Sequence, residues 1–497
     1  MSSVATPEAA AADTALRLFR QGRIHAAHGI VEALHAMRRA VAREALQRIA
    51  REAPGSAAAL CLAEDRLRGA PPAEALEAAE AALAASYAAG PPAPSLAAHG
   101  RLLEALVIAL CNEASGPPEE RARRAERGAN LPARLRALAR RDRQVLGPRP
   151  WNLLARGLAF AAANRHQAAL TAFGGLAALL HAADPAARLW QHSSLGAPSA
   201  TVAAQAAALR VLRDDTAGVG EGAAGAPAGL LGEEVLTPAH EGRGAVIWTV
   251  ADSAYADRFL ATSLISLQLA PALLHLHLVL SDAAEVPALR LRVAEAVARA
   301  EAAHDRTAQA RPAAARPFGA LRLTVSFDKL RAASPVGLAG LRFQALPEIQ
   351  ARYPGREIFV TDLDAVVVRS PEVAASWVQE ADIAAPITFL ERMPHKHAYP
   401  WRGVSAGQII LSPGPGGLRM GRAIAAAIGT DLPAAMARRG WWTDQAALYA
   451  ALLAARATPG IRIANLARQG RTAIAVPRLG ETKDAFRDRM AAEFGPG

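Results

Sequence analysis

Apolar residues in the first part of the chain recur at the spacing of a helix. Leu16 with Phe19, and Val31 with Leu34, lie three residues apart, so each pair shares one helical face. Similar spacing continues almost without interruption, and the segments between these runs are short. The pattern predicts an α-helical domain over residues 1–215.

Three segments of this region share one arrangement of small and apolar residues. In residues 15–27, 59–75 and 152–169 an apolar helical run is followed by a glycine and then by an alanine about four residues on. Small residues at these points would let two antiparallel helices approach closely. The arrangement resembles tetratricopeptide repeats, whose stacked helix pairs bury one continuous core and often hold a partner protein. An alanine-rich helical bundle is the other structure that the pattern allows.

The pattern changes after a segment rich in glycine, alanine and proline, residues 216–243, which we predict to be a linker. Short apolar runs then alternate with helical periodicity up to the C-terminus. This alternation predicts a mostly parallel sheet with helices on both faces, in a domain over residues 244–497. The predicted strands are 245–250, 273–280, 321–327, 357–361 and 404–412, the predicted helices are 255–269, 287–303, 338–352, 418–428 and 446–453, and residues 302–317 are expected to form a mobile surface insertion.

Two aspartates follow the strand predicted over residues 357–361. Asp362 and Asp364 are separated by one residue, so on an extended chain both side chains would point to the same side. Ligands of parallel sheets bind beyond the carboxyl ends of the strands, where Asp252 also lies. Two carboxylates there could hold Mg²⁺ or Mn²⁺, whose remaining ligands a diphosphate would supply. The spacing therefore allows a metal site, and two acidic residues that merely end a strand are the alternative.

An Asp-x-Asp pair after a strand also begins the haloacid-dehalogenase phosphatases. That fold needs a downstream lysine and a further acidic pair at another strand end. Only Lys396 and Lys483 follow the pair here, and no Gly-Asp-x-x-x-Asp segment does. A phosphatase of this type is therefore the weakest of the functions that we consider.

Several motifs occur together in the order found in one enzyme group. Pro371 follows the aspartate pair, a small-residue turn at Ser405-Ala406-Gly407 precedes an apolar run, and Asp444-Gln445 opens a helix. Together with the segment around Asp252, these motifs resemble the nucleotide-diphosphosugar glycosyltransferases of the family-8 and family-77 type, over about residues 245–486. The resemblance implies the GT-A fold, which is Rossmann-like. This domain would follow the helical-repeat-like domain in the chain.

The resemblance assigns residues to the nucleotide and the metal. Asp252 and Tyr255 would contact the nucleobase, Tyr255 by stacking. Asp362 and Asp364 would bind Mn²⁺ or Mg²⁺, and Asp362 would also contact the ribose or diphosphate. Lys483 would meet the diphosphate.

A second group of residues would surround the transferred sugar. Ser405, Ala406 and Gly407 would line the sugar pocket. Asp444 and Gln445 would lie against the sugar as the catalytic pair, with Asp444 stabilising positive charge at the anomeric carbon. An Asp444 that merely caps its helix is the structural alternative.

The resemblance implies a metal-dependent hexosyltransferase. It would move a sugar from a UDP- or GDP-sugar to a hydroxyl group of a glycan, lipid or protein, with retention at the anomeric carbon. The chain departs from the family because no histidine after His397 can supply a third metal ligand; His395 and His397 are expected in a loop near the acceptor. A non-catalytic helical-repeat scaffold with a degenerate transferase domain therefore stays as the alternative.

Composition adds few constraints. The net charge of +11 comes almost entirely from arginine, without interleaved aromatic residues, so we do not predict nucleic-acid binding. Cys61 and Cys111 lie in apolar helical runs and are expected to be buried thiols; their number and spacing argue against a zinc site. No signal peptide and no apolar run long enough for a membrane span is recognisable. We therefore predict a cytoplasmic protein, either free or peripheral at the inner face of the membrane.

Overall fold

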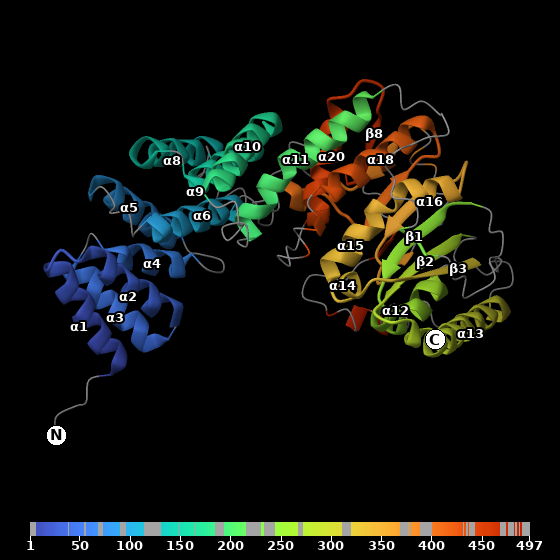
Figure 1. The fold of residues 1–497 in the computed structure, drawn as a ribbon, viewed down its shortest axis with the longest axis horizontal. Coiled ribbons are helices and arrows are strands. Elements are labelled where there is room, and N and C mark those ends of the chain that lie inside the picture. The colour runs from blue at the N-terminus through green and yellow to red at the C-terminus, as the bar shows by residue number, and fades with distance from the viewer. Residues whose placement is uncertain are drawn as a thin grey trace. The chain divides into compact units, whose positions relative to one another are not determined.

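The computed structural model forms two compact units, residues 1–189 with 392–400 and residues 190–391 with 401–497 (Figure 1). Each unit is described by itself. The residues described are 6–37, 39–53, 56–67, 73–89, 96–113, 131–147, 149–163, 165–183, 193–214, 230–232, 244–266, 272–310, 320–367, 380–387, 400–430, 443–467 and 474–475, with the short pieces 376, 378, 432–433, 436, 482, 485–486 and 488–489.

The first unit is built from helices, as the sequence pattern predicts. Consecutive helices pack against one another, and the tetratricopeptide identity stays a prediction. The helices are α1 (Pro7–Arg20), α2 (Ile24–Met37), α3 (Ala40–Glu52), α4 (Ala57–Arg66), α5 (Ala73–Ala89), α6 (Leu96–Glu113), α8 (Leu131–Leu146), α9 (Pro150–Ala162) and α10 (His166–Ala183). Among the described residues no helix is both long enough and apolar enough to cross a bilayer.

A glycine allows two of these helices to approach closely. A side chain at Gly157 of α9 would place its Cβ 2.1 Å from a ring carbon of Phe173 in α10, and that ring is fully buried. The small residue expected at this position is therefore required by the packing of the pair. At the other end of the unit, Gly22 forms the turn between α1 and α2 with a φ of +69°.

A buried network of hydrogen bonds joins α5, α6 and α8. His99 Nε2 lies 2.5 Å from Asp142 Oδ1, and both side chains are almost completely buried. The Tyr87 hydroxyl donates to the same oxygen over 3.1 Å, and Ser86 Oγ lies 3.1 Å from His99 Nδ1. Polar groups removed from water need partners, so this network fixes how the three helices meet.

We expect Asp142→Ala to lower the free energy of unfolding by about 2–4 kcal/mol, because it leaves the buried His99 and Tyr87 without their acceptor, and each unsatisfied buried polar group costs roughly 1–3 kcal/mol. Chemical denaturation followed by far-UV circular dichroism measures this. Arg20→Ala, which removes the exposed Arg20–Glu52 pair, is the control and should change little. A loss for Asp142→Ala no larger than for the control would contradict the assignment.

The second unit contains a seven-stranded sheet in the order β3-β2-β1-β4-β7-β6-β8. Neighbouring strands from β3 to β4 are parallel, β7 is antiparallel to β4 and to β6, and β8 is parallel to β6. The strands are β1 (Val246–Ala251), β2 (Leu273–Leu280), β3 (Ala320–Phe327), β4 (Ile358–Thr361), β6 (Ile383–Ala385), β7 (Gln408–Leu411) and β8 (Ile463–Asn465), while β5 (Val366–Val367) and β9 (Ile474–Ala475) form a separate antiparallel pair.

Helices cover both faces of this sheet (Figure 1). Consecutive residues of β1 point to opposite faces: Ile247 joins the core under α12 and α13, whereas Trp248 donates its indole N–H to the Arg342 carbonyl of α15. The helices are α11 (Ser193–Arg213), α12 (Ser253–Ser266), α13 (Val286–Ala310), α14 (Lys329–Ala332), α15 (Pro335–Gln344), α16 (Leu346–Arg352), α18 (Pro415–Gly429) and α20 (Thr443–Arg456). The predicted α/β architecture is confirmed at this level.

Several boundaries differ from the sequence prediction. The single helix expected over 338–352 is two helices, because Pro347 lacks the N–H that would continue the first. Residues 302–310, expected in a mobile insertion, continue α13, whose buried Ala303 packs inward. The short strands β6 and β8 were not predicted.

Two segments that precede the sheet in sequence also belong to the second unit. Helix α11 lies within the range predicted for the helical domain, but it belongs to the second unit, where Arg419 of α18 donates to the Leu212 carbonyl. Within the predicted linker, Leu231 is buried and a Cβ on Gly232 would lie 2.4 Å from the Val325 carbonyl of β3. The rest of 216–243 lies outside the described residues.

Two histidines are buried inside the sheet. His275 contacts Thr324 Oγ1 at 3.0 Å and the Tyr353 hydroxyl at 2.9 Å, and His277 contacts Thr324 Oγ1 at 2.8 Å. Burial, with a smaller contribution from Arg352, lowers the pKa of His275 to about 2 and that of His277 to about 3. Both rings therefore fold in the neutral form.

The folded state should lose stability in acid through these two residues. Below about pH 6.5 the unfolded chain binds protons that the folded chain excludes, so each histidine lowers the free energy of unfolding by about 1.4 kcal/mol per pH unit. We expect a combined loss of roughly 3–4 kcal/mol between pH 7 and pH 5. Urea denaturation at several pH values measures the free energy of unfolding, and the difference between wild type and the double variant His275→Gln/His277→Gln gives the contribution of the two histidines. Equal slopes against pH for both proteins would contradict this account.

Candidate functional site

The candidate site lies where the strand order reverses. Strands β2 and β3 extend from one side of β1, and the chain then returns to place β4 on the other side. At such a switch point the loops after the two central strands diverge and leave a crevice at their carboxyl ends. Asp252 follows β1 and Asp362 follows β4, so both predicted residues lie at this point.

The register of β4 with β7 brings the small-residue turn to the aspartate. Thr361 pairs with Gln408 in this antiparallel ladder, so the next residue, Asp362, lies opposite Gly407. A Cβ on Gly407 would approach Asp362 Oδ2 to 2.9 Å. The absence of a side chain at Gly407 therefore leaves room beside this carboxylate oxygen.

Asp362 and Asp364 are presented by a turn and not by an extended strand. The Ala365 N–H donates to the Asp362 carbonyl over 3.1 Å, and Leu363 between the two aspartates is buried in the core. The alternation argument from an extended chain was therefore wrong. Both carboxylates nevertheless act on Tyr255: burial first, and then the hydrogen bond with Asp364, raise the pKa of its hydroxyl, with a further contribution from Asp362.

Tyr255 is positioned by its own helix terminus. The Asp252 side chain caps α12 by accepting a hydrogen bond from the Tyr255 N–H over 2.7 Å. The Tyr255 ring packs against Phe259, with ring centroids 4.6 Å apart. In this structure Tyr255 thus supports Asp364, and its predicted stacking on a nucleobase stays a prediction.

Arg342 was not predicted, and it links the predicted residues. Its side chain is 4% exposed, its Nη1 forms an ion pair with Asp362 Oδ1, and its Nη2 lies 3.8 Å from Asp444 Oδ2. The hydrogen bond from Trp248 to the Arg342 carbonyl ties this part of α15 to β1. Its only sequence signal is its place between Leu341 and Phe343 in an otherwise apolar helix.

Asp444 and Gln445 lie in the first turn of α20. Asp444 Oδ1 accepts from the Gln445 N–H over 2.8 Å, and since α20 begins at Thr443 the residue is not the N-cap. Burial raises the pKa of Asp444, and the Arg342 guanidinium opposes this increase. Gln445 Oε1 is buried without a hydrogen-bond partner among the described residues. Such an atom is commonly satisfied by a ligand or by water.

Asp362 and Asp364 are the residues that would hold a hard divalent cation. Arg342 occupies one oxygen of Asp362, while Oδ2 faces the space left by Gly407, and Asp364 offers a second carboxylate. Within the described part of the chain, no third histidine, cysteine or acidic ligand joins them. Mg²⁺ in proteins is often bound by one or two carboxylates together with phosphate oxygens, so two protein ligands suffice.

The remaining predicted residues are placed in part. Ser405 donates its N–H to the Pro386 carbonyl over 3.1 Å, and Ala406 is buried. Both directly precede Gly407 in the chain, so all three residues lie at the N-terminal end of β7. Lys483, His395 and His397 lie outside the described residues.

Comparisons with known proteins identify no relative. No family model matches the chain, and neither the curated proteins nor the solved structures contain a match. Any function must therefore be argued from the site itself.

Arg342→Met should lower the free energy of unfolding by about 2–3 kcal/mol, because it leaves Asp444 partly buried without its cation. The loss is smaller than for a fully buried pair, since the Asp362 side chain is 51% exposed. Urea denaturation measures it, and Asp444→Asn in the same chain should recover part of the loss. Arg331→Met, which removes the Arg331–Asp328 pair, is a matched control. Strictly additive effects of Arg342→Met and Asp444→Asn would contradict the coupling.

Proposed function

We propose that the second unit is a glycosyltransferase that moves a hexose-like sugar from a UDP- or GDP-sugar to a hydroxyl group of a glycan, lipid or protein. One observation carries the proposal. Residues of four separate segments meet at Asp362: Tyr255 interacts with the Asp362–Asp364 pair, Gly407 lies beside Asp362 Oδ2, and Asp444 shares the partner of Asp362, Arg342. The sequence resemblance assigns the same four segments to one site.

The diphosphate of the donor would bind at the aspartate pair. Asp362 Oδ2 and Asp364 would hold Mg²⁺ or Mn²⁺, which when bound offsets the negative charge of the departing nucleoside diphosphate. Tyr255 holds Asp364 through its hydroxyl, and Arg342 holds Asp362 through Oδ1. Both carboxylates are thus oriented by neighbours before any ligand arrives, which lowers the cost of binding.

The sugar would lie between Gly407 and the start of α20. Positive charge develops at the anomeric carbon as the diphosphate leaves, and a nearby carboxylate stabilises it. Arg342 opposes the effect of burial on the pKa of Asp444 and so favours the charged form that this role needs. Gln445 Oε1, which has no partner among the described residues, can accept a hydrogen bond from a sugar hydroxyl.

Retention at the anomeric carbon and the nature of the acceptor follow from the resemblance alone. The helical unit would hold the acceptor or a partner protein, as stacked helix pairs commonly do. We place this activity in the cytoplasm or at the inner face of the membrane.

A non-catalytic scaffold is the second candidate, and one observation favours it. Arg342 neutralises one oxygen of Asp362, and two carboxylates without a third protein ligand are a minimal set for a cation. A domain that had lost activity would keep the ion pair as a structural link and would bind no nucleotide.

Asp364→Ala should abolish hydrolysis of the preferred nucleotide sugar or reduce it by about 100-fold or more, the size of loss typical when one electrostatic element is removed. A panel of UDP- and GDP-sugars with Mn²⁺ identifies the donor by release of the nucleoside diphosphate. Thermal unfolding of the same protein with nucleotide and Mn²⁺ measures binding separately. Wild type should be stabilised only when both are present.

Asp282→Asn is the matched control, because Asp282 also follows a strand and caps a backbone N–H, but after β2 and outside the site. It should keep full turnover. No nucleotide-dependent stabilisation in wild type would favour the scaffold. Turnover of a generic phosphate ester that Asp362→Asn abolishes would favour a phosphatase. Equal donor consumption by wild type and Asp364→Ala would refute the site.

A further inference from the structure

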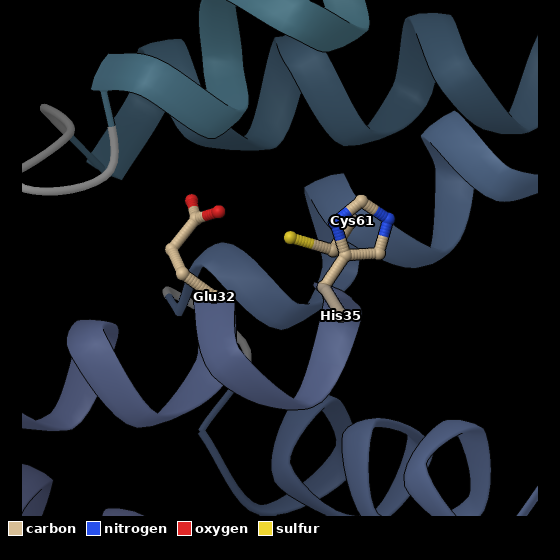
Figure 2. Close-up of side chains that lie close together, drawn as sticks. All are labelled: Glu32, His35 and Cys61. Atoms are coloured by element: carbon tan, nitrogen blue, oxygen red, sulfur yellow. The ribbon is translucent and has the colours of Figure 1, made fainter. Parts of the chain in front are cut away.

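We propose that the first unit carries a zinc site formed by Glu32 and His35 of α2 with Cys61 of α4. Figure 2 shows the three side chains close together, with the thiol of Cys61 directed toward Glu32 and the imidazole of His35 beside Cys61. One ligand atom of each lies within 4.8 Å of the others. This site is independent of the function proposed for the second unit.

The ligands are brought together by helical spacing. Glu32 and His35 are three residues apart on α2, so both side chains leave the same face of the helix. This Glu-x-x-His spacing recurs in metal sites built inside helix bundles. Cys61 belongs to the facing side of α4 and is buried, as is His35. An ion held by all three would tie α2 to α4.

The histidine has the partner that a metal-bound imidazole usually has. Its Nε2 lies 3.1 Å from Asp65 Oδ1, so Nδ1 is the nitrogen left for an ion. A carboxylate on the far nitrogen fixes the tautomer and the ring orientation of zinc-binding histidines. Asp65 is four residues from Cys61 on α4, so one helix supplies both a ligand and this orienting group.

Glu32 keeps one oxygen for an ion. Arg101 of α6 donates to Glu32 Oε2 over 2.7 Å and to Glu64 Oε2 over 3.1 Å. Glu32 Oε1 is buried without a hydrogen-bond partner in the described part of the chain. The guanidinium therefore orients the carboxylate through Oε2 and leaves Oε1 for an ion, while its Nη2 also donates to Cys61 Sγ over 4.0 Å.

The donor set selects the metal. Nitrogen, sulfur and oxygen ligands together suit Zn²⁺, whereas Mg²⁺ and Ca²⁺ prefer oxygen alone. Tetrahedral zinc holds its ligand atoms about 3.5 Å apart, so the three side chains need to close by about 1 Å. Three protein ligands leave the fourth position to water. The sequence prediction against a zinc site rested on the number and spacing of the cysteines, which does not apply to a site with one cysteine.

Co²⁺ is the probe, because a thiolate bound to Co²⁺ gives a charge-transfer band that oxygen ligands do not give. The untagged full-length chain, stripped with a chelator, is titrated with Co²⁺ and then with Zn²⁺, which should displace it. We expect one Co²⁺ per chain with a thiolate band. Cys61→Ser should abolish the band, and Asp65→Asn should weaken binding about 10- to 100-fold, the usual effect of losing such an orienting group.

Two controls separate this site from other metal binding. Cys111→Ser should keep the band, since Cys61 is the one cysteine in the proposed ligand set. Asp362→Asn/Asp364→Asn should also keep it, so failure here is distinguishable from failure of the proposed transferase site. If Cys61→Ser does not fold by circular dichroism, His35→Gln and Asp65→Asn carry the test. Absence of a thiolate band in wild type, or its persistence in Cys61→Ser, would overturn the proposal.

Discussion

The candidate site depends on one buried cation. Arg342 reaches from α15 to Asp362 at the end of β4 and to Asp444 at the start of α20, so a single guanidinium relates three elements that are distant in sequence. Its carbonyl is held by Trp248 of β1. Without this positive charge, nothing would offset the cost of partly removing the carboxylates of Asp362 and Asp444 from water. The guanidinium also suits this place because it remains charged when buried.

The sheet supplies the geometry that the ion pair then fixes. The switch in strand order places the ends of β1 and β4 side by side, and the antiparallel pairing of β4 with β7 puts Gly407 opposite Asp362. Each residue is needed for a different reason: the aspartate for its charge, the glycine for its missing Cβ, and Trp248 for one hydrogen bond. The register of β4 with β7 therefore places the charge of Asp362 beside the space at Gly407. A shift of this register by one residue would separate the two.

The sequence revealed what depends on local pattern. The runs that became β1, β2 and β4 are continuous and apolar, as strands covered on both faces must be, and their ends marked Asp252 and Asp362 correctly. Strands of three residues such as β6 give too few positions for a period to be recognised. Arg342 was missed for another reason: its burial arises from tertiary packing, which no local pattern of charges records. The turn at Asp362–Ala365 was not predicted, because the Asp-x-Asp motif was taken to be extended.

Both candidate metal sites use arginine in the same way. Arg342 takes Oδ1 of Asp362 and leaves Oδ2 beside Gly407, and Arg101 takes Oε2 of Glu32 and leaves Oε1. A guanidinium on one oxygen fixes the orientation of a carboxylate, because its donors are planar and directed. It also repels a second cation nearby, so an ion must offset that repulsion through further ligands. At Glu32 the thiol and the imidazole can supply them from the protein, whereas at Asp362 a diphosphate must do so. The first site would therefore hold its ion alone, and the second only together with a nucleotide.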